Sequence, residues 1–134
     1  QRQMCIRDRD TTGLVFLADY GQYGNRKIHV IDTTLIQQGS NITMTTSQTL
    51  PLEFNPRGIA LYKNLMYISA ADGSIRCYDR EKKKFFLTFK SVPGYTFKGG
   101  QKLLVYNNRL WVTDVSTREI VGVDIFRNVI EEYE

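Results

Sequence analysis

An internal repeat constrains the fold of this chain more than any other feature of its sequence. Three short apolar segments each carry an aromatic side chain at their second position, at Phe16, Tyr67 and Trp111. A second segment follows each of them, opening with isoleucine and closing with aspartate, over residues 28–32, 75–79 and 120–124. The copies recur about 45 residues apart, a period typical of architectures built from one supersecondary unit per repeat.

Each repeat holds four candidate strands separated by turn residues. A first strand precedes the aromatic segment over residues 59–64 and 103–108, and a fourth closes each unit over residues 42–46, 85–89 and 129–133. This pattern predicts a four-stranded antiparallel meander, which buries both faces only by stacking on copies of itself. We therefore expect an all-β fold, an incomplete β-propeller of about three four-stranded antiparallel blades. The three repeated aromatic side chains are expected to pack between blades.

Residues 1–9 do not follow the repeat, since they contain three arginines and no strand alternation. They resemble translated sequencing-adapter read-through, as found in metagenomic genes, and are interpreted as an artefactual leader; a frayed basic tail is the alternative. The rest, 10–134, is then a partial propeller with blade one at 10–50, blade two at 51–91 and blade three at 92–134. In this interpretation blade one lacks its innermost strand. Further blades of the same chain are needed to close the ring.

Composition and charge narrow the classes of function. The chain is 42% hydrophobic and 24% charged, as is typical of a globular protein, and no apolar run reaches the roughly 18 residues of a membrane span. The net charge is +4, and it falls to +2 without the leader. The largest basic cluster, residues 80–84, is a single turn with Glu81 inside it, so nucleic acid is not an expected partner. Outside the leader, Cys77 is the one cysteine, and the compartment stays unknown.

Several short motifs resemble the NHL and YVTN group of propeller repeats. The second repeat reads Pro56-x-Gly58-Ile59-Ala60, then Leu65-Met66-Tyr67-Ile68, then Ile75-x-x-Tyr78-Asp79, and the third matches with Leu110-Trp111-Val112-Thr113-Asp114. The resemblance covers residues 13–134. It implies that ligands bind at the face formed by two classes of loop. One class joins second to third strands, and the other joins each fourth strand to the next blade.

Candidate binding residues are the polar side chains expected on those loops. Arginine and tyrosine favour a protein or anionic partner over a bare metal ion, which prefers clustered oxygen ligands. The competing interpretation is that they are ordinary solvated loop residues. The candidates are Tyr20, Tyr23, Arg26, Arg57, Asp72, Tyr95, Lys98, Asp114 and Arg118.

For the other ionisable residues, a structural role is considered before a role in binding a ligand or metal. Asp19 and Asp114 close second strands, where each either caps its loop or contacts a ligand or metal. The aspartates that close the third strands, Asp32, Asp79 and Asp124, recur in every unit and are expected to serve turns. His29 has no second histidine or cysteine to complete a metal set, so it is expected to be an ordinary sheet residue.

The sequence therefore predicts a non-catalytic propeller scaffold that binds a protein or small anionic ligand through its loop face, without a cofactor or metal. The alternative is a metal-dependent lactonase, a gluconolactonase-like hydrolase whose metal ligands lie mostly in missing blades. The resemblance implies that such enzymes hold their metal with Glu, Asp and Asn side chains at the channel mouth. The innermost strands here offer Arg57 and Gln101 instead. No serine-hydrolase elbow or phosphate-binding loop motif is present in the sequence.

Overall fold

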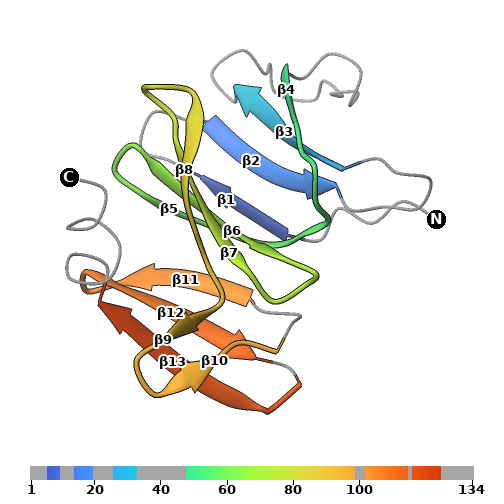
Figure 1. Ribbon diagram of the computed structural model, residues 1–134. Coiled ribbons are helices and arrows are strands. Elements are labelled where there is room, and N and C mark those ends of the chain that lie inside the picture. Colours follow the sequence, from blue (N-terminus) through green and yellow to red (C-terminus); the bar gives the residue numbers. More distant parts are fainter. Residues whose placement is uncertain are drawn as a thin grey trace, which may run out of the picture.

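All regular structure that the computed structural model describes is β-strand (Figure 1). The described residues are 6–9, 14–19, 26–32, 48–98, 102–114 and 116–124. Within these ranges the strands form three antiparallel sheets and one short hairpin. The all-β class predicted from the repeat is confirmed. No helix in the described part of the chain could cross a membrane.

The first sheet contains four consecutive strands in the order β1-β2-β3-β4. Phe16 in the second of these strands lies opposite Asp8 on one side and Val30 on the other. The fourth strand lies later than the expected segment 42–46, which falls outside the described residues. The strands are Ile6–Arg9, Leu14–Asp19, Lys27–Asp32 and Gln48–Pro51.

The second sheet repeats this order as β5-β6-β7-β8. Every residue of its second strand is buried, because each face of the sheet is covered by a neighbouring sheet. The register between the first two strands shifts between Pro56 and Gly58, which marks a bulge at Arg57. The strands are Pro56–Tyr62, Leu65–Ala70, Ile75–Asp79 and Lys84–Phe89.

A two-stranded hairpin, β9 (Ser91–Val92) and β10 (Tyr95–Thr96), links the second sheet to the third. Its turn is Pro93-Gly94, and Gly94 has a φ of 86°, the conformation that favours glycine after proline in a tight turn. The third sheet has the order β11-β12-β13 in the described residues, and the expected fourth strand at 129–133 lies outside them. Its strands are Lys102–Tyr106, Arg109–Asp114 and Glu119–Asp124.

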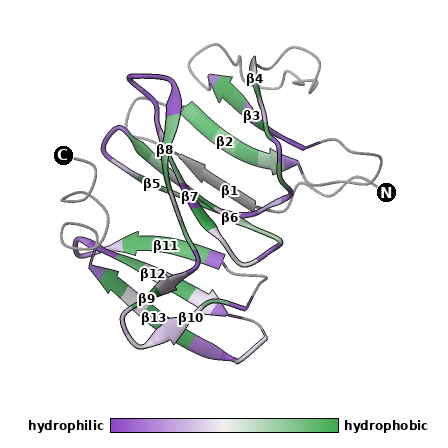
Figure 2. Ribbon diagram, viewed as in Figure 1, coloured by the Kyte–Doolittle hydropathy of each residue, from purple (hydrophilic) through white to green (hydrophobic). Residues whose placement is uncertain are grey.

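Two apolar clusters join the sheets into a stack. Phe16 and Ile28 of the first sheet pack with Ile59, Met66 and Ile68 of the second. A second cluster forms between the other face of the second sheet and the third sheet, and it contains Tyr67, Cys77, Leu110, Val112 and Val123. Figure 2 shows hydrophobic residues concentrated in the strands and hydrophilic residues in the turns. Burying a single aliphatic or aromatic side chain of this kind stabilises a fold by about 1.5–3 kcal/mol.

The repeated aromatic side chains do not all pack between sheets. Phe16 and Tyr67 are buried there, as predicted. Trp111 is partly exposed and lies on the face of the third sheet that the second sheet does not cover, so the expectation is wrong for this residue. The reason is that no further sheet packs on that face in the described part of the molecule.

The first blade does not lack its innermost strand. β1 pairs with β2 over four residues, with Ile6 opposite Ala18 and Arg9 opposite Val15, in the place that β5 takes in the second sheet. The interpretation that blade one lacks this strand is therefore wrong, because residues 6–9 provide it. A strand is paired through backbone N–H and C=O groups that every non-proline residue carries, so the edge of β2 accepts a segment with no apolar alternation. The adapter-derived origin of residues 1–9 stays a prediction.

Candidate functional site

In each sheet, a described residue at the end of the second strand, or between it and the third strand, forms a hydrogen bond with the connection that enters or leaves the sheet at the same end. The backbone N–H of Leu52 donates to the carbonyl of Arg26 across 2.8 Å, and that of Ala71 donates to the carbonyl of Asn55 across 2.9 Å. In the third sheet, the N–H of Lys98 donates to a carboxylate oxygen of Asp114 across 2.8 Å. These segments together are called the loop face. It comprises Arg26 and residues 52–57, 71–74, 95–98 and 116–118.

Asp114 organises the part of the loop face that belongs to the third sheet. This side chain closes β12 and is 1% exposed. Its Oδ2 accepts the hydroxyl of Tyr95 (2.7 Å) and the N–H of Lys98 (2.8 Å), while Oδ1 accepts the N–H of Ser116 (3.0 Å). The backbone N–H of Arg118 donates to the Asp114 carbonyl (2.7 Å). Four predicted site residues, Tyr95, Lys98, Asp114 and Arg118, are thus brought together.

The ionisation of this cluster follows from the same hydrogen bonds. Burial acts to raise the pKa of Asp114, but hydrogen bonds from Lys98, Tyr95, Ser116 and Thr117 together hold it below its ordinary value. Partial burial, with the Asp114 carboxylate close by, raises the pKa of Tyr95. Near neutral pH the pair is therefore a carboxylate that accepts a hydrogen bond from a neutral phenol. The interpretation of Asp114 as a loop cap is confirmed, because it accepts a backbone N–H from Ser116 in the loop that follows it and another from Lys98 in the connection before β11.

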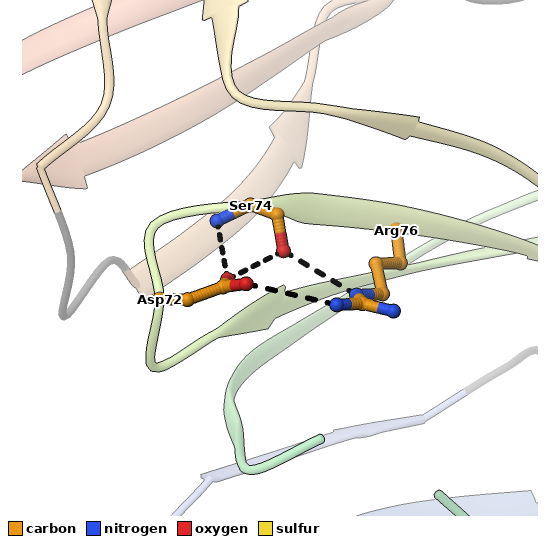
Figure 3. Close-up of polar contacts among 3 residues, drawn as sticks. All are labelled: Asp72, Ser74 and Arg76. Atoms are coloured by element: carbon orange, nitrogen blue, oxygen red, sulfur yellow. Dashed lines mark hydrogen bonds and ion pairs between the residues drawn. The ribbon is translucent and has the colours of Figure 1, made fainter. Parts of the chain in front are cut away.

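A second polar cluster consists of Asp72 and Ser74 on the β6–β7 loop and Arg76 in β7 (Figure 3). Oδ1 of Asp72 accepts the backbone N–H of Ser74 (2.9 Å) and its hydroxyl (2.6 Å). Nε of Arg76 donates to the Ser74 hydroxyl oxygen (3.3 Å), and a guanidinium nitrogen lies 3.7 Å from Asp72 Oδ2. The hydrogen bond from the Ser74 side chain is the main reason that the pKa of Asp72 is lowered. The guanidinium of Arg76 also stacks on Phe54, 4.3 Å from the ring centroid.

The other candidate residues are not joined to either cluster by the contacts described above. Arg26 and Arg57 have exposed side chains, and Arg57 sits at the bulge that opens β5. Tyr20 and Tyr23 lie outside the described residues. The described candidate residues thus share one end of the sheets, and three of them, Tyr95, Lys98 and Arg118, contact Asp114.

Aspartates at equivalent positions have different partners. Oδ2 of Asp19 lies 3.1 Å from Nε2 of His29, and both side chains are buried. The histidine is therefore part of a polar pair, which the sequence interpretation missed. Asp79 accepts the N–H groups of Glu81 (2.9 Å) and Lys82 (3.1 Å), so its predicted turn role is confirmed. Within the residues that the structure describes, no group of three or more His, Cys, Asp or Glu side chains could hold a metal ion.

Sequence reasoning also missed the partners that complete the two loop-face clusters. Ser74, Arg76 and Thr117 were not singled out, although Thr117 lies 2.6 Å from the Tyr95 hydroxyl. Ser74 could be predicted from the sequence, because a serine two residues after an aspartate, here Asp72, is a common turn arrangement. The hairpin that positions Tyr95 was likewise signalled by Pro93-Gly94, a frequent turn dipeptide.

Comparison with solved structures shows the fold. The chain is similar to AztD from Citrobacter koseri in two structures, with TM-scores of 0.55 and 0.54 and sequence identities of 16% and 17%. These alignments cover 90% and 85% of this chain and 30% of each AztD chain. It is also similar to U3-55K, with a TM-score of 0.55 and 9% identity over 90% of this chain and 36% of that one. At such identities the likeness concerns the fold alone.

The chain spans about a third of the length of these structures. It matches no protein-family profile, and no curated protein matches its sequence. AztD and U3-55K are both β-propeller proteins. The chain therefore has an all-β fold of stacked antiparallel blades that form part of a β-propeller and do not close a ring.

Proposed function

We propose that this chain is part of a propeller scaffold that binds a partner carrying acidic groups through its loop face. The observation that carries the proposal is the Asp114 cluster. Its hydrogen bonds hold the backbone of Lys98 and Arg118 in place, and both side chains are exposed. Binding groups held in this way lose less conformational entropy when a partner docks.

The charge of the loop face favours an acidic partner. Its exposed cations are Arg26, Arg57, Lys98 and Arg118, and its exposed acids are Glu53 and Asp72. The carboxylate of Asp72 already accepts two hydrogen bonds from Ser74. An excess of positive charge attracts acidic partners and speeds their association.

Two other expectations stay proposals. The resemblance of the strand motifs supports assigning the repeats to the NHL and YVTN group. The lactonase alternative needs acidic metal ligands at the channel mouth. The innermost strand of the second sheet instead carries the cation Arg57 near its start. We therefore place the scaffold function first.

The proposal is tested with fluorescein-labelled acidic dodecapeptides rich in Glu and Asp. Their amide counterparts, with Gln and Asn, serve as uncharged probes, and binding is followed by fluorescence anisotropy. The double variant Lys98→Gln/Arg118→Asn should weaken acidic-peptide binding about tenfold, since each exposed charge makes a modest contribution. Asparagine is chosen because residue 118 has a φ of 60°, which asparagine tolerates.

A matched control removes two positive charges at the opposite end of the second sheet, in the variant Lys82→Gln/Lys84→Gln. Both residues are exposed. If the control weakens binding as much as the loop-face variant, the interaction is only general attraction to a basic protein. Equal binding of the acidic peptides and their amides would also rule the proposal out.

A further inference from the structure

A hollow of about 320 Å³ lies beside β7 and β8, the last two strands of the second sheet. This volume is at the lower end of the range of ligand pockets, about 300–1,000 Å³, and suits a small molecule. The lining residues come from the end of β4, from the connection between β4 and β5, and from β7 and β8. They are Pro51, Glu53, Phe54, Arg76, Phe85 and Thr88.

Two aromatic rings form the apolar part of the hollow. Phe85 lies opposite Tyr78 in the pairing of β7 with β8, and Tyr78 packs against the cluster between the first and second sheets. Phe54 belongs to that cluster, and its ring centroid lies 5.9 Å from that of Phe85. The ring of Phe54 is buried, whereas Phe85 is 39% exposed. A planar apolar group can therefore contact Phe85 without displacing the core.

The guanidinium of Arg76 is held in one orientation at this hollow. Its Nε donates to the Ser74 hydroxyl oxygen, and its plane stacks on Phe54. Figure 3 shows one terminal nitrogen turned toward Asp72, at 3.7 Å, and the other turned away. Neither terminal nitrogen has a hydrogen-bond acceptor in the described part of the chain. Arg76 thus presents an oriented fork of donors, the geometry that binds a carboxylate through two hydrogen bonds.

Glu53 supplies the opposite charge. Its side chain is exposed and forms no hydrogen bond or ion pair with the described residues. The hollow is therefore lined by one cation and one anion. A ligand with a single charge would match one of these side chains and be repelled by the other, whereas a ligand with both charges matches the pair.

We propose that this hollow binds a free aromatic α-amino acid, such as L-phenylalanine. Arg76 binds its carboxylate, Glu53 binds its ammonium group, and its ring packs on Phe54 and Phe85. The free amino acid carries both charges on one carbon, whereas a residue at either end of a peptide has only one of them. The proposal does not depend on the binding of an acidic partner, which rests on Lys98 and Arg118.

The test titrates L-phenylalanine into the full chain labelled with nitrogen-15 and follows the backbone amide signals by NMR. A ligand of this size is expected to bind with a Kd of about 1 mM. Saturable shifts should appear at the amides of residues 53, 54, 76, 85 and 88. L-phenylalaninamide lacks the carboxylate, N-acetyl-L-phenylalanine lacks the ammonium group, and each should bind about tenfold more weakly.

Two variants separate the roles of the charged residues. Glu53→Gln should keep the melting temperature, because Glu53 is exposed, and should abolish the preference for L-phenylalanine over its N-acetyl derivative. Arg76→Gln should abolish the preference for L-phenylalanine over its amide. If Arg76→Gln lowers the melting temperature, Glu53→Gln alone still decides the outcome. Glu119→Gln, which removes an exposed acid from β13 outside the hollow, is the matched control and should change neither preference.

Three results would overturn the proposal. The first is the absence of saturable shifts at the lining residues at about ten times the expected Kd. The second is equal binding of L-phenylalanine, its amide and its N-acetyl derivative, which would show contact with the rings alone. The third is a loss of preference in Glu119→Gln as large as that in Glu53→Gln, which would show that the charge of the whole chain is responsible.

Discussion

The phenol of Tyr95 donates a hydrogen bond of 2.7 Å to the carboxylate of Asp114, 19 positions later in the chain. The contact ties the hairpin that leaves the second sheet to the end of the central strand of the third. At Asp19, the aligned aspartate of the first sheet, one carboxylate oxygen lies 3.1 Å from Nε2 of His29. The Asp114 cluster therefore positions this hairpin against the end of β12, and its contribution to the free energy of unfolding can be measured.

Replacing Asp114 by alanine should lower the free energy of unfolding by about 3 kcal/mol, because several donors around a buried carboxylate lose their acceptor. Asp72→Ala is the matched control, since Asp72 also accepts hydrogen bonds from its loop but is exposed. We expect it to cost less than about 1 kcal/mol. Urea denaturation followed by Trp111 fluorescence measures both, and similar losses would contradict the central role of Asp114.

The stability should depend on pH through Asp114. Its pKa in the folded chain lies below the ordinary value of 3.8, so the carboxylate stabilises the fold fully above that pH. The contribution is lost as the pH falls through the lowered folded pKa. The difference in unfolding free energy between the natural chain and Asp114→Asn should be constant near neutrality and shrink below pH 3.8. A difference that does not change down to pH 2 would show that the charge of Asp114 is irrelevant.

Tyr67→Phe should leave the fold equally stable or more stable, by up to about 1 kcal/mol. The hydroxyl of Tyr67 is buried and has no hydrogen-bond partner in the described residues. Removing such a group relieves a desolvation penalty and keeps the aromatic ring in the core. Tyr67→Ala, in contrast, should cost about 3–5 kcal/mol because it opens a cavity. Thermal melts of both variants decide between this and a stabilising role for the hydroxyl.

The thiol of Cys77 should not react with Ellman's reagent while the chain is folded. It is buried in the cluster between the second and third sheets, and burial raises its pKa, so little thiolate forms. The experiment uses Cys5→Ser, which leaves Cys77 as the one cysteine. Urea should release full reactivity, and rapid labelling in native buffer would mean that the two sheets separate readily.

Deleting residues 1–9 tests the strand that they provide. We expect the deletion to lower the free energy of unfolding by about 1–3 kcal/mol and to speed amide exchange in β2, since the inner edge of that strand loses its partner. Deleting residues 1–5 serves as the control because it keeps β1. If removing all nine residues changes neither quantity, β1 adds nothing to stability and the interpretation as an artefactual leader gains support.

The sequence predicted the second and third strands of each sheet to within one residue. Burial between two sheets explains why Leu65–Ala70 is almost entirely apolar, and a tight turn explains the aspartate that closes Ile75–Asp79. Strands that are held mainly by backbone hydrogen bonds have a weaker pattern of apolar residues in the sequence. β1 and the β9–β10 hairpin were missed for this reason.

The candidate site was predictable only in outline. Its place at one end of the sheets follows from the order of the strands, and Asp114 stands out at the end of a strand. Its partners depend on how the loops fold back. Tyr95 and Lys98 reach Asp114 because the Pro93-Gly94 turn reverses the chain. Their spacing in the sequence, 19 and 16 positions before Asp114, does not indicate that they contact it.

The consecutive strand order within each sheet bears on how the chain folds. Since every strand pairs with its neighbour in sequence, each blade can form through short loop closures, without waiting for distant segments to meet. The second sheet is covered on both faces, so its amide hydrogens should be the last to exchange. The three-stranded part of the third sheet should open first, in fluctuations that leave the middle blade intact.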